Sequence, residues 1–313
     1  MVDFEEVPAP LAPFAGARPP APAWFDAAIA QTPERGAIEV DGASIELLSW
    51  GERGRPGLLL LHGNGAHADW WSWTAPFFAE THRVAAISWS GMGESSWRES
   101  YSGDQFALEA FAGAEAAGLF DAGPPVFVGH SFGGFPMLVA AKTGGERLAG
   151  VVSVDSPIRP PEHQWRGPPS RHRANRVYPT LEEALARFRF APPQGCETLY
   201  IADHIARTSL KRAPLEDGSG EGWTWKFDPF MWRAFRMEER ASFLTDARCP
   251  VALLWGARSK LLSPEVIAYM RGLAKPGTPM VEIPDADHHV MVDQPLAFVS
   301  ALRGLLSAWP ASR

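Results

Sequence analysis

Residues 126–134 read VFVGHSFGG, and they indicate which architecture this chain of 313 residues can adopt. Val126–Val128 is an apolar run of strand length, and a helix-compatible run, Phe135–Lys142, follows it. Between them lies Gly-x-Ser-x-Gly, in which glycines permit a cramped strand-to-helix turn that presents the serine. Chance alone produces this pattern in roughly one chain in ten of this length, so the flanking strand and helix carry the prediction. We therefore expect Ser131 to be a nucleophile.

Strand-like and helix-like patterns alternate from Ala37 onward, which is typical of a mostly parallel sheet with helices on both faces. Ile38–Val40 and Ile45–Ser49 are joined around Asp41-Gly42, which indicates a hairpin leading into the sheet. Buried strands are expected at the apolar runs bounded by Gly or Pro, namely Leu58–Leu61, Val84–Ser88, Val126–Val128, Val151–Val154, Val251–Trp255 and Met280–Ile283.

This alternation stops between Pro157 and Arg248, where Pro, Arg and Trp are frequent and no clear buried strand is apparent. Helical patterns occur at Leu181–Phe188 and Thr198–Leu210, with a Gly-rich loop at Gly218–Gly222. We expect a largely helical cap over the C-terminal edge of the sheet, where open α/β sheets bind ligands. The expected organisation is an arm over residues 1–36, an α/β core over 37–156 and 249–313, and a cap domain over 157–248.

A serine hydroxyl is a poor nucleophile until a neighbouring base takes its proton, so a histidine must come from elsewhere in the chain. Asp287-His288-His289 lies in the loop after the last predicted strand. This position favours His288 as the base, ahead of His289.

His62-Gly63-Asn64-Gly65 follows the predicted strand Leu58–Leu61. Acyl transfer needs backbone N–H donors aimed at the oxygen on which negative charge develops, and removing one donor typically costs about 2.7–4 kcal/mol. We expect Asn64 to supply one N–H and Phe132, which follows the nucleophile, to supply the other. A glycine-rich turn is the alternative interpretation, and His62 itself is expected to be a packed structural residue.

Together these motifs resemble the α/β-hydrolase superfamily: His-Gly after the third core strand, Gly-x-Ser-x-Gly after the fifth, and His288 seven positions before Pro295. The resemblance extends from about Ala37 to Leu306 and implies the α/β-hydrolase fold with a variable cap. Residues 88–95, SWSGMGES, fit the Gly-x-Gly-x-Ser turn of that family, although Ser88 and Ser90 replace its usual Asp and Arg.

The resemblance leaves the acid of the triad open between two loops. Relatives often carry it after the seventh strand, where this chain offers Ser259, and others carry it after the sixth, where Asp155 follows Val151–Val154. A carboxylate is needed to hold the imidazole tautomer and to stabilise its protonated form, so we predict Asp155. Two alternatives to this prediction are that Asp155 is a structural residue that caps a turn, and that Glu265 is the acid. The chain order Ser131, Asp155, His288 is that of the fold.

Charge and cysteine content exclude several classes of protein. The net charge of -7 is spread along the chain, which argues against nucleic acid as the main partner. Cys196 and Cys249 have no metal-ligand spacing, and a disulfide framework is not expected. The N-terminus carries acids rather than the basic start of a secretory signal, and the apolar runs are strand-sized. We expect a cytoplasmic protein with no membrane partner.

The nucleophile limits the chemistry. Relatives that open epoxides or displace halide use an aspartate at the elbow, whereas Ser131 suits acyl transfer to a water molecule. We expect hydrolysis of a small-molecule hydrophobic ester or lactone, with no metal or organic cofactor. Trp70 and Trp71 follow the oxyanion loop and could line an apolar substrate pocket, or they could pack a helix against the sheet.

Two further hypotheses remain open from the sequence. The first is a carbon–carbon bond hydrolase that acts on vinylogous diketones and leaves simple aryl esters nearly untouched. The second is a non-catalytic ligand receptor on the same fold, which would have an eroded triad.

Overall fold

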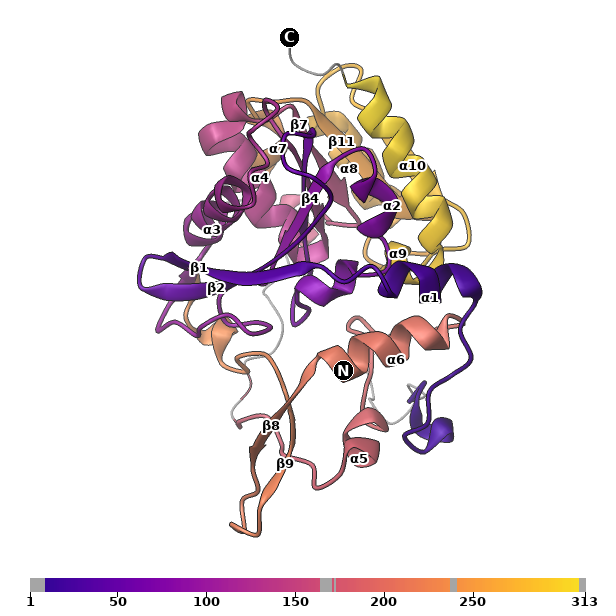
Figure 1. Ribbon diagram of the computed structural model, residues 1–313. Coiled ribbons are helices and arrows are strands. Elements are labelled where there is room, and N and C mark those ends of the chain that lie inside the picture. The colour runs from indigo at the N-terminus through magenta and orange to yellow at the C-terminus, as the bar shows by residue number, and fades with distance from the viewer. Residues whose placement is uncertain (1–8, 164–170, 172, 237–240, 310–313) are drawn as a thin grey trace.

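An eight-stranded sheet forms the centre of the computed structural model, which describes residues 9–163, 171, 173–236 and 241–309. Its strand order is β1-β2-β4-β3-β6-β7-β11-β12 (Figure 1). The pairs β1–β2 and β2–β4 are antiparallel, and the remaining neighbours are parallel. The strands are β1 (Glu34–Val40), β2 (Ala43–Trp50), β3 (Gly57–Leu61), β4 (Arg83–Ile87), β6 (Val126–His130), β7 (Gly150–Val154), β11 (Val251–Gly256) and β12 (Met280–Ile283).

Helices cover both faces of this sheet, which is why the central strands are continuous apolar runs. Leu58 and Leu60 belong to one buried cluster, and Leu59 and Leu61 belong to the other, because successive side chains point to opposite faces. The first cluster includes side chains of α1 (Ala23–Ile29), α2 (Pro76–Ala79) and α10 (Pro295–Ala308). The second includes those of α3 (Gly103–Ala116), α4 (Gly134–Gly144), α7 (Ala241–Thr245) and α8 (Pro264–Leu273). The predicted α/β architecture is confirmed.

Residues 157–248, here called the insertion, connect β7 to β11. They contain the two predicted helices as α5 (Leu181–Leu185) and α6 (Leu199–Thr208). They also contain an antiparallel hairpin of β8 (Leu210–Pro214) and β9 (Glu221–Trp225), for which no strand was predicted. The elements α5, α6, β8 and β9 lie below the sheet in Figure 1, whereas α7 packs on the sheet beside α4. Lys211 and Arg212 are exposed in β8, so the hairpin lacks the apolar run that reveals a buried strand.

Helix α6 shows how the insertion is attached to the core. Its residues Ile201, Ala202, Ile205 and Ala206 are fully buried, so one face is apolar at helical spacing. On the same helix Arg207 Nε donates to Asp203 Oδ2 over 2.8 Å, an i,i+4 pair that supports the helix.

The N-terminal arm lies against both parts of the molecule. Arg207 Nη2 of α6 donates to the carbonyl oxygen of Gly16 over 2.6 Å, and Leu11 is 2% exposed. In α1, the ring of Phe25 lies 4.9 Å from that of Tyr200 in α6. Trp24 of the same helix lies 6.1 Å from Phe77 of α2. The arm therefore connects the insertion to the core.

Two other expectations concern the chain as a whole. Within the described residues, no helix has the length and apolar character needed to cross a membrane. Cys196 and Cys249 are both free thiols, the first half-buried and the second buried.

Candidate active site

Ser131 lies at the turn between β6 and α4, with a φ of 53°. A residue other than glycine rarely adopts this left-handed conformation, which costs energy and is common at functional sites. The turn is also crowded: a Cβ on Gly129 would lie 2.7 Å from the carbonyl oxygen of Gly133, and one on Gly133 would overlap that of His62. The glycines of Gly-x-Ser-x-Gly therefore let the chain fold back closely enough to present Ser131.

His288 lies in the loop between β12 and α9 (Val290–Asp293), and it is 2% exposed. Its Nδ1 lies 2.8 Å from Asp155 Oδ1, and its Nε2 lies 2.8 Å from Ser131 Oγ. An ionised carboxylate can only accept, so Nδ1 carries the proton and Nε2 is left to accept from the serine hydroxyl. The structure thus brings the three predicted residues into one hydrogen-bonded chain, in the geometry that a general base requires.

Asp155 directly follows β7 and is fully buried, with a φ of 49°. Besides His288, its carboxylate accepts from the backbone N–H of Gly256 over 2.9 Å and from Ser259 Oγ over 2.7 Å. A buried carboxylate needs such donors because it has lost its hydration. The geometry supports Asp155 over the alternatives named for the acid.

Ser259 therefore has a function in the site that the sequence did not reveal. It occupies the place where relatives often carry the acid, and here its hydroxyl donates to the acid supplied by the neighbouring strand. The contact follows from the adjacency of β7 and β11 in the sheet, which no local sequence pattern shows. Glu265, the other candidate acid, lies on α8 with 61% of its side chain exposed and pairs with His163 instead.

The loop after β3 lies beside the nucleophile. A Cβ on Gly63 would lie 3.2 Å from the Cβ of Ser131, so this backbone closely approaches the elbow. The exposed Asn64 accepts a hydrogen bond at Oδ1 from Nε1 of Trp232 in the insertion, over 3.1 Å. Phe132 is 3% exposed and its ring packs 5.4 Å from that of Trp232. Both predicted oxyanion residues flank Ser131, and the donor role of their amides stays a prediction.

His62 is a structural residue, as expected. It is 1% exposed, its Nε2 accepts from the backbone N–H of Trp89 over 3.0 Å, and its Nδ1–H donates to the Gly63 carbonyl over 2.8 Å. Burial lowers the pKa of His62 to about 3, so the ring is neutral at pH 7. It fixes the turn after β4 against the loop after β3.

The two predicted substrate-contacting tryptophans lie in different surroundings. The ring of Trp70 lies 5.5 Å from His289 and 6.1 Å from Phe190 of the insertion, which places it near the triad. Trp71 is 1% exposed and its ring lies 6.1 Å from Phe298 of α10. Trp71 thus packs η2 (Ala68–Trp71) on a core helix, the alternative considered from the sequence.

Among the described residues, the ring nitrogens of one buried histidine group, His130, His288 and His289, come within 4.8 Å of one another. His130 Nε2–H donates to the carbonyl oxygen of His288 over 3.0 Å. Burial, reinforced by His288, holds the pKa of His130 and of His289 well below the usual range, so both are neutral ligands at pH 7. Both nitrogens of His288 already bond to Asp155 and Ser131, so a metal ion bound by His288 would displace one of them. The nitrogens of His288 are therefore engaged in the triad and are not free to bind a metal ion.

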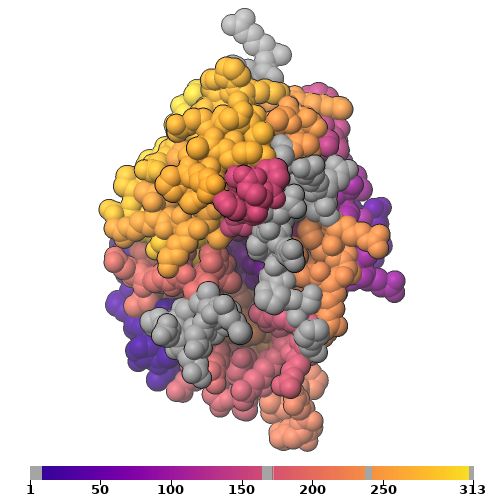
Figure 2. Space-filling model, turned by 180° about the vertical axis from the view of Figure 1, so that it is seen from behind, coloured from indigo at the N-terminus to yellow at the C-terminus, as the bar shows by residue number. Residues whose placement is uncertain are grey.

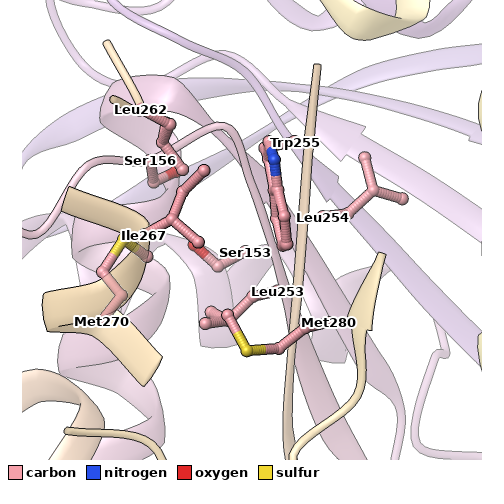
Figure 3. A pocket seen from close by; sticks show the side chains of 9 residues that line it. All are labelled: Ser153, Ser156, Leu253, Leu254, Trp255, Leu262, Ile267, Met270 and Met280. Atoms are coloured by element: carbon pink, nitrogen blue, oxygen red, sulfur yellow. The ribbon is translucent and has the colours of Figure 1, made fainter. Parts of the chain in front are cut away.

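A small cavity of about 10 Å³ lies between the end of β7 and α8, lined by Ser153 and Ser156 and by apolar side chains such as Leu253 and Ile267 (Figure 3). A cavity of this size is at the lower limit for one water molecule. It is far too small for a substrate. Ser153 Oγ is buried there without a protein hydrogen-bond partner.

Comparison with protein families gives one match over most of the chain. The model of the Alpha/beta hydrolase family matches residues 58–302, a span that includes Ser131, Asp155 and His288.

Known proteins with similar sequences or folds include several hydrolases. The chain is 25% identical over 281 residues to the esterase Rv0045c of Mycobacterium tuberculosis, covering 85% of this chain and 88% of that one. A thioesterase domain from the curacin biosynthetic pathway superposes with a TM-score of 0.71 at 22% identity, covering 87% of this chain and 99% of the domain. The E-2-(acetamidomethylene)succinate hydrolase superposes with a TM-score of 0.69 at 18% identity, covering 88% and 99%. The two superpositions establish a shared fold.

Proposed function

The chain belongs to the alpha/beta hydrolase family, and on that premise we propose that it cleaves carboxylic esters or lactones through an acyl-enzyme on Ser131. One observation carries the proposal: His288 contacts Ser131 Oγ and Asp155 Oδ1 over 2.8 Å each. A nucleophile, a base and a group that orients the base are the parts that acyl transfer requires. The esterase relative supports the choice of an oxygen ester.

In the proposed reaction, Ser131 Oγ attacks the substrate carbonyl carbon while His288 Nε2 takes the hydroxyl proton. The backbone N–H groups of Phe132 and Asn64 stabilise the negative charge that develops on the carbonyl oxygen. His288 then gives its proton to the leaving alkoxide, and the alcohol departs. A water molecule, deprotonated by His288, then attacks the acyl-enzyme carbonyl. His288 gives this proton to Ser131 Oγ as the ester bond to Ser131 breaks, which releases the carboxylic acid and restores the free serine.

Asp155 stabilises the imidazolium that forms at His288 during each of these steps. Gly256 N–H and Ser259 Oγ both donate to this buried carboxylate. These two hydrogen bonds keep the carboxylate aligned with Nδ1 of His288.

The insertion acts as a cap over this site in our proposal. In Figure 2, salmon atoms of the insertion lie directly below yellow-orange atoms of the core. Aromatic rings of the insertion approach the site: Trp232 lies 5.4 Å from Phe132, and Phe190 lies 4.9 Å from His289. Such rings favour a hydrophobic substrate group.

The first test is the intact mass of the protein after exposure to a fluorophosphonate, which transfers its phosphonyl group to an activated serine and loses fluoride. We expect one adduct on the wild type and none on Ser131→Ala. Ser153→Ala is the matched control, because Ser153 is a buried serine that does not contact His288, and this variant should keep the adduct.

Turnover measurements then decide the substrate class. We expect hydrolysis of short-chain aryl esters, abolished in Ser131→Ala. Turnover of a vinylogous diketone with aryl esters left nearly untouched would replace the ester proposal with carbon–carbon bond hydrolysis. A folded wild type that forms no adduct and turns over neither substrate would favour a ligand receptor.

A further inference from the structure

The insertion contacts the loop that carries His288 through the segment Gln194–Thr198. Gln194 Nε2 donates to Asp293 Oδ1 over 2.9 Å and to Oδ2 over 3.0 Å. Gln194 Oε1 accepts from the backbone N–H of His289 over 3.1 Å. Thr198 Oγ1 donates to the carbonyl oxygen of Val292 over 2.8 Å. Side chains from the insertion thus bind the loop on the C-terminal side of His288.

These contacts also reach the residue before His288. Asp293 Oδ2, which accepts from Gln194, also accepts from the backbone N–H of Asp287 over 2.9 Å. The amide of Gln194 is therefore connected to both neighbours of His288: directly to His289, and through Asp293 to Asp287. A single side chain of the insertion restrains the backbone on the two sides of the base.

We propose that Gln194 is a positioning residue for His288, so that an insertion side chain sets the alignment of the base in the core. The inference rests on the proposed function. His288 Nε2 must stay within hydrogen-bond reach of Ser131 Oγ, which it meets at 2.8 Å. A displacement of about 1 Å from such a geometry can cost a hundredfold in rate. The core restrains the same loop where His130 donates to the His288 carbonyl, so losing Gln194 loosens the loop without releasing it.

Two substitutions test this role. Gln194→Met keeps the length of the side chain but removes its donors and its acceptor, and Gln194→Ala removes the side chain beyond Cβ. Asn175→Ala is the matched control, because Asn175 is another half-buried amide of the insertion. Its Nδ2 donates to the carbonyl oxygens of Trp225 and Phe227 over 3.2 and 2.7 Å and makes no contact with the His288 loop.

The rate constant for fluorophosphonate modification of Ser131 and the kcat for an aryl ester are the kinetic readouts. Both should fall about tenfold or more in the two Gln194 variants, the equivalent of losing one or two hydrogen bonds, with KM changed little. The Asn175→Ala variant should react at the wild-type rate. The far-downfield proton resonance of His288 Nδ1–H should broaden or shift in the Gln194 variants, while their Tm falls no more than that of the control.

Wild-type rates in both Gln194 variants would overturn the inference, and so would a rise in KM at unchanged kcat, which would make Gln194 a substrate contact. The proton resonance of His288 Nδ1–H distinguishes failure of this inference from failure of the proposed function. A wild type that is unreactive toward fluorophosphonate but whose resonance depends on Gln194 would refute the esterase proposal and keep the positioning role. A resonance that is the same with and without Gln194 would refute the positioning role in either case.

Discussion

Ser131 and Asp155 are held by the sheet, whereas His288 is held by a loop that the insertion restrains. The first two directly follow the adjacent parallel strands β6 and β7, where His130 is paired with Val154. Both adopt a positive φ, 53° and 49°. His288 follows β12, the edge strand of the sheet, and the amide of Gln194 restrains its neighbours.

This difference separates two ways in which the site can fail. A substitution of Ser131 or Asp155, which follow β6 and β7, removes a reacting or charged group while the surrounding sheet stays in place. A lesion around His288 leaves all three groups present and changes their alignment. The substitutions below each test one of these two ways.

Asp155→Asn should have the largest effect on activity. The amide can present an N–H to His288 Nδ1, which favours the wrong imidazole tautomer and removes the charge that stabilises the imidazolium. A loss of about 10⁴-fold in kcat is expected by analogy with other serine triads. Glu265→Gln is the matched control, because the exposed Glu265 makes no contact with His288, and it should retain the wild-type kcat. A comparable loss in that control would reopen the assignment of the acid.

Asp293→Asn tests the contacts around His288, and its readout is the pH dependence of the free energy of unfolding. Burial, together with the charges of Asp287 and Asp155, raises the pKa of Asp293 to about 7, although Asp287 N–H and Gln194 oppose this shift. The folded protein therefore binds this proton more tightly than the unfolded chain does. The contribution of Asp293 to the free energy of unfolding should fall as the pH rises from about 4 to about 7, by about 3 kcal/mol between pH 5 and pH 8, and this contribution should be absent in Asp293→Asn.

Other groups titrate in the same pH range. The difference in the free energy of unfolding between wild type and Asp293→Asn at each pH therefore isolates the contribution of Asp293. Burial lowers the pKa of His62 and of His67 to about 3, so these residues make stability rise with pH between about 3 and 6.5 in both proteins. Urea unfolding at pH 5 and at pH 8 measures the difference. Parallel pH profiles for the two proteins would show that Asp293 does not titrate in this range.

Ser259→Ala should have a moderate effect, because Asp155 keeps the backbone donor Gly256 after the hydroxyl is lost. The loss of one hydrogen bond to a buried charge corresponds to about 1.5–3 kcal/mol. We expect part of this free energy to be lost from catalysis, which lowers kcat roughly tenfold, and the rest to be lost from the folded state, which lowers Tm. An unchanged kcat would show that the sheet alone aligns Asp155.

Ser153→Ala should have the smallest effect. Ser153 Oγ is buried without a protein hydrogen-bond partner and lines the small cavity between the end of β7 and α8 (Figure 3). Removing an unpartnered hydroxyl should leave the free energy of unfolding within about 1 kcal/mol of the wild type or raise it slightly. Urea unfolding measures the change. A decrease larger than this would show that the hydroxyl has a favourable partner in solution.

The parts of the site that depend on local sequence could be predicted. Ser131 lies in a turn defined by its own glycines, and Asp155 follows at once after an apolar strand. His288 follows the last strand, and the serine nucleophile requires a base. The sheet could be predicted for the same reason, because its strands are buried on both faces and are continuous apolar runs.

The parts that depend on contacts between distant segments could not be predicted. Ser259 donates to Asp155 because β7 and β11 are neighbours, and 104 positions separate the two residues. Gln194 reaches Asp293 from the stretch between the two predicted helices of the insertion, where no hydrophobic period indicates the path of the chain. The β8–β9 hairpin was not predicted because its strands are partly exposed and carry charges.

One free thiol lies in the insertion and the other in the core, so their alkylation rates can report on the two parts of the molecule separately. Cys196 belongs to the segment that contacts the His288 loop, and Cys249 lies just before β11 in the core. Burial raises the pKa of each thiol to about 11, so alkylation at neutral pH is slow while either stays covered. The alkylation rate at Cys196, which is half-buried, therefore reports on the exposure of the insertion segment at the loop. The rate at Cys249 measures how often the core opens, on the same molecule and in one mass spectrum.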